Sequence, residues 1–144
     1  MIPRYGRPPG RRAYRRRPGI YAILPRAGRV LLTFQNGPVP EFQLPGGGID
    51  PGEQPLPALA REVLEETGWT IARPRRLGTY RRFTFMPEYD LWAEKICHVY
   101  VAHPARRLGP PAEPDHLETW MNFREALSCL ASEGDRRLLA ATLG

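Results

Sequence analysis

Short β-type segments lie on both sides of one long helical pattern. Alternating or continuous apolar runs bounded by turn residues predict strands over residues 19–25, 29–34, 42–44, 69–72, 77–86, 93–103 and 118–122. Apolar residues three and four positions apart predict a central helix that ends before Gly68 and two closing helices over 123–131 and 135–143. Strands that flank a helix and precede a helical pair predict an α+β fold, with a mixed sheet between layers of helices.

The segments between the predicted strands are rich in glycine and proline. Ala27-Gly28 predicts a turn between two hairpin strands, and residues 35–41 and 87–92 are expected to form loops. Gly46–Gly48 predicts a glycine loop in which backbone groups can approach a bound ion or phosphate closely. Residues 104–116 predict a proline-rich loop that leads into the last strand.

The central helix has an apolar face beside an acidic face. At about 100° per residue, Glu62, Glu65 and Glu66 fall within roughly 100° of one another. The residues expected to face the core are Leu56, Leu59, Ala60, Val63 and Thr67. Carboxylates at this spacing repel one another, and a hard cation removes the repulsion. The acidic face therefore predicts a site for Mg²⁺ or Mn²⁺, which prefer oxygen ligands together with substrate phosphates and water.

A helix face rich in glutamate is more often a solvated surface than a metal site, so the neighbouring residues decide between the two. From Gly47 the pattern continues with five residues, Glu53, seven residues, Arg61-Glu62, Val63, Leu64, Glu65-Glu66, Thr67 and Gly68. Chance should produce this register on the order of once in 10⁸–10⁹ positions. The run resembles the signature box of the Nudix hydrolases. It departs at one softer position, because Trp69 stands where the family usually has Ile, Leu or Val.

The resemblance implies an α/β/α sandwich and a MutT-like pyrophosphohydrolase that cleaves a nucleoside diphosphate linked to another group. It implies a divalent metal, Mg²⁺ or Mn²⁺, with ligands from Gly46, Glu62, Glu65 and Glu66. Within the box, Glu53 would support the site. Arg61 would orient Glu53 or Glu66 through a charge-assisted hydrogen bond.

The general base is open between two kinds of residue. In this family the base is a glutamate of the box or a glutamate on a downstream loop. Glu113 lies on the proline-rich loop shortly before a predicted strand, a placement similar to that of the family's loop base. Asp115 and Glu118 are alternatives in the same region.

Length and charge indicate one domain with a basic N-terminal segment. The chain has 144 residues, and its seven arginines and four prolines within residues 1–18 predict a flexible tail before a Nudix domain over 19–144. No apolar run approaches the length of a membrane span, and Cys97 and Cys129 form no close-spaced metal motif. These features favour a cytoplasmic protein with reduced thiols. His98, His103 and His116 also lack ligand spacing and are expected to be ordinary histidines.

The net charge of +6, from twenty arginines and one lysine against fifteen acids, suits a polyanionic partner. A small phosphorylated substrate, expected to be a nucleotide, is favoured over RNA. Charge and stacking faces for it are offered by Tyr80, Arg81, Arg82, Phe83 and Tyr89, although such aromatics more often belong to a core. The alternatives are a non-catalytic nucleotide- or RNA-binding module, an RNA 5′-pyrophosphohydrolase and a diphosphoinositol polyphosphate hydrolase. Monomer and homodimer both remain open.

Overall fold

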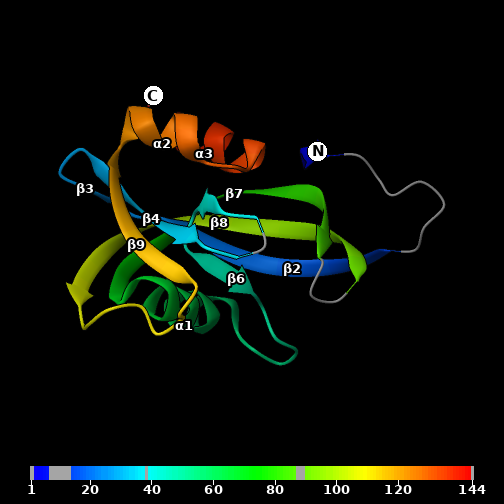
Figure 1. Ribbon diagram of the computed structural model, residues 1–144, viewed down its shortest axis with the longest axis horizontal. Helices are drawn as coiled ribbons and strands as arrows, with labels where there is room; N and C mark the ends of the chain where they lie inside the picture. The colour runs from blue at the N-terminus through cyan, green and yellow to red at the C-terminus, as the bar shows by residue number, and fades with distance from the viewer. Residues whose placement is uncertain (1, 7–13, 38, 87–89, 144) are drawn as a thin grey trace.

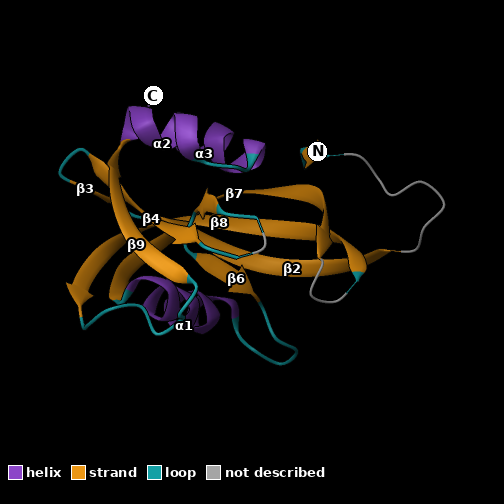
Figure 2. Cartoon of the chain, in the orientation of Figure 1, coloured by secondary structure: helices purple, strands orange, loops and turns teal. Residues whose placement is uncertain are grey.

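Two β-sheets lie between helix α1 on one side and helices α2 and α3 on the other (Figures 1 and 2). The computed structural model describes residues 2–6, 14–37, 39–86 and 90–143. Both parallel and antiparallel pairs occur in the larger sheet. The arrangement confirms the predicted α+β sandwich with a mixed sheet.

The larger sheet has five strands in the order β1-β7-β8-β2-β6. They are β1 (Arg4–Tyr5), β7 (Trp69–Met86), β8 (Leu91–Arg107), β2 (Tyr14–Ile23) and β6 (Gly46–Gly48). The pairs β1/β7 and β2/β8 are parallel, whereas β7/β8 and β2/β6 are antiparallel. Strands β2, β7 and β8 are long, and their far halves extend beyond the helices (Figure 1).

The smaller sheet is built around β4 (Arg29–Gln35). Strands β3 (Pro25–Arg26) and β5 (Glu41–Gln43) pair with opposite ends of β4. Strand β9 (His116–Asn122) pairs antiparallel with β4 along its whole length. This register brings His116, at the start of β9, opposite Gln35 at the end of β4.

The helices are α1 (Pro55–Thr67), α2 (Phe123–Cys129) and α3 (Glu133–Leu143). No described helix is long and apolar enough to cross a membrane. Successive side chains of a strand face opposite sides of a sheet, and β2 supplies both cores in this way. Ile20 and Ala22 pack in the cluster that contains Leu59 and Val63 of α1, whereas Ile23 packs in the cluster of α2 and α3.

Helix α1 ends at Gly68, which adopts a left-handed conformation with φ of 82° and donates its N–H to the carbonyl of Leu64. This glycine cap stops the helix where the sequence predicts. The buried residues of the helix are Ala58, Leu59, Val63, Glu66 and Thr67. The expectation that Leu56 and Ala60 face the core is wrong, because both are exposed. The buried arc is rotated toward the acids because Glu66 hydrogen-bonds the neighbouring strand β6.

Three segments differ from the strand and loop assignments made from sequence. The glycines 46–48 form an edge strand paired with β2, not a loop. Strand β7 runs through residues 73–76 with register shifts, because a bulge takes up Arg73 at φ of 52° and Pro74. Strand β8 extends into both expected loops, at 91–92 and 104–107, since it pairs with β7 along that length. Residues 87–89 lie outside the described part of the chain.

The N-terminal segment contributes to the larger sheet. Strand β2 begins at Tyr14, so residues 14–18 of the expected tail belong to a strand. Arg4 and Tyr5 form β1, which pairs with β7. Of the expected tail, residues 7–13 lie outside the described part of the chain.

A fully buried carboxylate, that of Glu94 on β8, connects this segment to the domain. Arg4 donates from Nε to Oε2 of Glu94 at 2.8 Å. Arg16 of β2 and Arg81 of β7 approach Oε1 at 3.5 Å and 3.8 Å. A buried carboxylate is costly without charged partners, so the hydrogen bond from Arg4 and the nearby charges of Arg16 and Arg81 stabilise it jointly.

We expect Arg4→Ala to destabilise the protein by about 1–3 kcal/mol, because it removes the hydrogen-bonded cation of a buried carboxylate. Thermal unfolding should show a loss of roughly 3–8 °C. Arg15→Ala is the matched control, because Arg15 is exposed on β2 and its substitution removes the same charge. Equal melting temperatures for the two variants would show that the contact of Arg4 with Glu94 does not stabilise the fold.

Candidate active site

A pocket of about 340 Å³ contains the acids of α1 and the glycines of β6. Its acids are Glu62, Glu66 and Asp50, and its cations are Arg17 and Lys95. The remaining side of the pocket is lined by Gln35, Gln43 and His116 from the smaller sheet, together with Tyr21 and Met86. Carboxylates and cations therefore share one solvent-accessible space.

Glu66 is held by the glycine strand. The N–H of Gly46 donates to Oε1 of Glu66 at 3.1 Å, and Nε2 of His116 lies 3.6 Å from Oε2. Burial raises the pKa of Glu66 to about 8, against the lowering effect of the Gly46 N–H, and the charges of Glu62 and Glu113 raise it further. The carboxylate is thus placed where a nearby cation would be strongly favourable.

Glu62 lies directly against Gly47. A Cβ atom on residue 47 would come within 2.6 Å of the Glu62 carboxylate, so a side chain there would displace the carboxylate from this position. Burial raises the pKa of Glu62, and the charge of Arg61 opposes this effect. Since both Glu62 and Glu66 contact β6, the two carboxylates converge on the same three glycines.

Arg61 connects the start of the box to the helix. Its Nε and Nη2 donate to the two carboxylate oxygens of Glu53 at 2.7 Å and 2.9 Å. Its Nη1 lies 3.2 Å from Glu62 and 3.3 Å from both oxygens of Glu65. The hydrogen bond from Arg61 lowers the pKa of Glu53 and raises that of Arg61. Of the two partners that its register suggested, Glu53 and Glu66, Arg61 hydrogen-bonds Glu53.

The three acids of the expected metal face are divided between two environments. Glu65 points to Arg61 and does not line the pocket, whereas Glu62 and Glu66 do. Among the described residues, no group of three His, Cys, Asp or Glu side chains converges closely enough to hold an ion. Two carboxylates still fit Mg²⁺, which commonly binds through one or two carboxylates and completes its shell with water and substrate phosphates.

The acids of the loop before β9 and of its first residues, Glu113, Asp115 and Glu118, also lie in different surroundings. The N–H groups of Ala112 and Glu113 both donate to the carbonyl of Glu65, at 2.9 Å and 3.1 Å. The exposed Glu113 carboxylate is close enough to raise the pKa of Glu62 and Glu66. Glu113 is therefore the loop acid that lies beside the pocket.

The other two loop acids have different positions. Glu118 accepts hydrogen bonds from Nε1 of Trp69 at 2.9 Å and from Nε of Arg107 at 2.7 Å. Asp115 is exposed, and its carbonyl accepts from the N–H of Asn36. The contacts of Glu118 are those of a structural ion pair, which leaves Glu113 as the better-placed candidate base.

His116 is a site residue that the sequence did not reveal. Its Nδ1 lies 2.8 Å from Oγ1 of Thr33, and its Nε2 faces Glu66. Burial lowers the pKa of His116. A lone histidine at the start of a strand carries no spacing signal, and only the β4/β9 register brings it to the acids.

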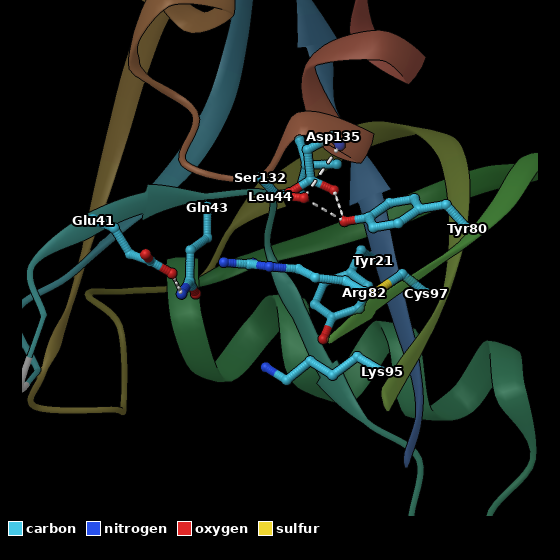
Figure 3. Close-up of a pocket in the computed structure, with 10 residues that line it drawn as sticks. All are labelled: Tyr21, Glu41, Gln43, Leu44, Tyr80, Arg82, Lys95, Cys97, Ser132 and Asp135. Carbon is cyan, nitrogen blue, oxygen red and sulfur yellow. Dashed lines mark hydrogen bonds between the residues drawn. The ribbon is translucent and has the colours of Figure 1, made fainter. Parts of the chain in front are cut away.

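A second, smaller cavity of about 40 Å³ lies on the α3 side of the sheet (Figure 3). It shares Tyr21, Gln43 and Lys95 with the first pocket. At its closed end, Tyr80 donates its O–H to Oδ1 of Asp135 at 2.6 Å. Burial raises the pKa of Asp135 to about 6, above its ordinary value of 3.8.

Asp135 should make stability depend on pH in a definite direction. The folded protein holds the Asp135 proton more tightly than the unfolded chain, so its contribution is present below pH 4 and is lost as pH rises through about 6. In the wild type, the free energy of unfolding should fall by about 2–3 kcal/mol across this pH range. In Asp135→Asn this fall should be absent. Denaturant unfolding between pH 4 and 7, with the exposed Asp115→Asn as control, measures it. Parallel pH profiles for wild type and Asp135→Asn would contradict the assignment.

The fold and the box together define the class of the protein. A family model, the NUDIX domain, matches residues 13–142. The chain therefore belongs to the Nudix family, as the box implies. Its similarity to a solved structure, the MutT NUDIX hydrolase from Burkholderia pseudomallei, extends over 87% of this chain and 96% of that one, with a TM-score of 0.67 and 26% identity.

Among curated proteins, similarity is partial. The chain is 38% identical over 78 residues to a putative 8-oxo-dGTP diphosphatase of Bacillus subtilis, covering 54% of this chain and 52% of the relative. It is 33% identical over 124 residues to the CMP-5′-(N-acetyl-N-hydroxy-3-aminopropyl)phosphonate hydrolase of Streptomyces rubellomurinus, covering 81% and 57%. It is also 44% identical over 60 residues to an RNA pyrophosphohydrolase of Cereibacter sphaeroides. This shorter match covers 35% of this chain and 37% of the relative. The chain thus spans about half the length, or less, of these relatives.

Proposed function

We propose that this protein is a Mg²⁺- or Mn²⁺-dependent pyrophosphohydrolase that cleaves a phosphoanhydride bond in a nucleotide-type substrate. The observation that carries the proposal is the convergence of Glu62 and Glu66 on the glycines of β6, in a pocket that also contains Arg17 and Lys95. A substrate with several phosphates fits a space with metal-binding acids at one part and cations at another.

Glu62 and Glu66 would hold the ion together with the Gly46 carbonyl. The bound ion would neutralise phosphate oxygens and make a water molecule more acidic. Glu65 is the third acid of the expected ligand set, and it acts here as a counter-ion of Arg61. His116 and the N–H of Gly46 fix the direction of the Glu66 carboxylate.

The Arg61–Glu53 pair would keep the start of the box in place. Two parallel hydrogen bonds between a guanidinium and a carboxylate define the relative geometry of both groups. Glu53 also accepts from the N–H of Asp50, so the turn before α1 is tied to the helix. This arrangement would hold the segment that follows the glycines at a fixed distance from the metal-binding acids.

Glu113 would take the proton from the attacking water. The N–H groups of Ala112 and Glu113 are bound to the carbonyl of Glu65, and this would keep the exposed Glu113 side chain near Glu62 and Glu66. A carboxylate oxygen in this position could accept a proton from water. Glu66, buried and hydrogen-bonded to Gly46, suits the role of ligand better.

The names of the relatives support a substrate with a nucleotide part, since an 8-oxo-dGTP diphosphatase and a hydrolase of a CMP-linked phosphonate both act on such molecules. RNA is the alternative substrate, because the basic N-terminal segment includes Arg15 and Arg16 of β2, and the same strand then brings Arg17 into the pocket. A non-catalytic binding module is the other alternative. Turnover of any anhydride in a substrate panel excludes it.

The first functional prediction is metal dependence with a stability readout. Millimolar Mg²⁺ should support phosphate or pyrophosphate release, and excess chelator should abolish it. Mg²⁺ should also raise the melting temperature, because an ion that binds only the folded state stabilises it. Glu66→Gln should lower turnover by at least about 10²-fold and remove the thermal shift.

Glu133→Gln is the control for this experiment, since Glu133 is an exposed acid on α3 and its loss changes the net charge equally. Undiminished turnover in chelator would refute the metal-dependent mechanism. A thermal shift retained in full by Glu66→Gln would show that the ion binds elsewhere.

The second functional prediction concerns the base. Glu113→Gln should lower kcat by about 10²–10⁴-fold, the usual contribution of a general base, while the Mg²⁺-induced thermal shift persists. Asp115→Asn, on the same loop, should leave kcat within about twofold because that carboxylate points to solvent. If both loop variants retain full kcat, the base lies within the box instead.

A further inference from the structure

Three cationic side chains stand in register across three neighbouring strands. Arg17 of β2 is the partner of Lys95 on β8, and Lys95 is the partner of Arg82 on β7. Residues opposite one another on paired strands project from the same face of a sheet. At about 4.8 Å between strands, the row of Arg17, Lys95 and Arg82 spans roughly 10 Å.

The cationic row, as we call these three residues, lies on the face of the sheet that carries Tyr21 and Cys97. Lys95 lines both cavities, Arg82 lines the smaller one and Arg17 the larger one. Figure 3 shows Arg82 and Lys95 extending in the same direction, toward the side of the cavity where Gln43 lies. The row therefore runs from the smaller cavity into the pocket that contains the acids of α1.

The edge strand β6 makes this connection possible. It is the edge strand next to β2, it contacts Glu62 and Glu66 of α1, and it consists of glycine only. A side chain at position 47 would meet the Glu62 carboxylate, and a Cβ at position 46 would meet the backbone of β2. An extended ligand can thus contact Glu62 and Lys95 at once.

Two members of the row, Lys95 and Arg82, have cationic groups available to an anionic ligand. Among described residues, neither Lys95 nor Arg82 forms an ion pair or a side-chain hydrogen bond. The acids nearest to them in the smaller cavity are Asp135, which is hydrogen-bonded to Tyr80, and Glu41, which accepts from Gln43. Gln35 and Gln43 supply neutral amides on the facing wall.

We infer that the cationic row binds an anionic group of the substrate beyond the anhydride that is cleaved, so that the enzyme prefers substrates with a further phosphate or phosphodiester. This inference rests on the proposed function for its catalytic consequence, although the row can bind phosphate without turnover. The two chemical sources are an additional phosphate of a free nucleotide and the first phosphodiester of a 5′-phosphorylated oligonucleotide. Both present anionic phosphate oxygens to arginine and lysine.

The kinetic test compares three substrates. In ADP-ribose both phosphates belong to the anhydride itself; adenosine tetraphosphate adds phosphates, and a 5′-triphosphorylated adenosine dinucleotide adds a phosphodiester. Lys95→Met and Arg82→Gln should raise KM at least fivefold for one of the last two substrates, with kcat within twofold. KM for ADP-ribose should rise by a clearly smaller factor, because this substrate has no phosphate beyond the anhydride. The substrate whose KM responds identifies the source of the anionic group.

The controls separate charge from packing. Lys95→Arg and Arg82→Lys should keep KM close to the wild-type value, because they retain the cation. Arg124→Gln removes an equal charge from the exposed face of α2 and should leave KM unchanged. Equal effects of Lys95→Met on all three substrates, or on kcat alone, would overturn the inference.

A binding experiment makes the row testable even without turnover. Inorganic tripolyphosphate is titrated calorimetrically into the full chain with excess chelator, at two salt concentrations. Lys95→Met and Arg82→Gln should weaken binding at least fivefold and reduce its salt dependence, whereas Arg124→Gln should not. Absent binding, or equal binding by all variants, overturns the inference. Row-dependent binding by a protein that hydrolyses none of the substrates supports the row and refutes the proposed function.

Discussion

The closeness of the glycine strand β6 to helix α1 is the constraint on which the site depends. Glu66 accepts a hydrogen bond from the backbone of Gly46, and Glu62 occupies the space that a side chain on residue 47 would need. The backbone thus orients Glu66 directly and leaves space for Glu62. The same contact withdraws both carboxylates from water, and this burial raises the pKa of each.

A single guanidinium balances the remaining charge of the box. Arg61 lies among the carboxylates of Asp50, Glu53, Glu62 and Glu65, at distances between 2.7 Å and 3.9 Å. Its shortest hydrogen bonds go to Glu53, which precedes the helix. Its charge therefore neutralises Glu53 more fully than it neutralises Glu62, which lines the pocket. A divalent ion bound beside Glu66 would favour the charged form of this carboxylate, whose pKa burial raises to about 8.

The sequence predicts much of this arrangement because the informative signals are local. The sequence predicts α1 and its acids from three local signals: helical spacing, the C-cap Gly68 and the register from Gly47 to Glu66. The position of Leu56 was mispredicted because the arc buried by a helix depends on its neighbours, and here β6 attracts Glu66 inward. His116 and the row of Arg17, Lys95 and Arg82 depend on strand register, which single-strand patterns do not contain.

The loop before β9 is attached to α1 through main-chain atoms. Leu108 donates its N–H to the carbonyl of Gly68, and Ala112 and Glu113 donate theirs to that of Glu65. Every amino acid except proline has the same backbone N–H, so these hydrogen bonds do not depend on the side chains of the loop. Side chains in the loop can therefore change while these anchor points persist. Evolution can therefore alter the chemical character of the loop surface, and with it the molecules that the loop excludes or admits, without moving the acid at its end.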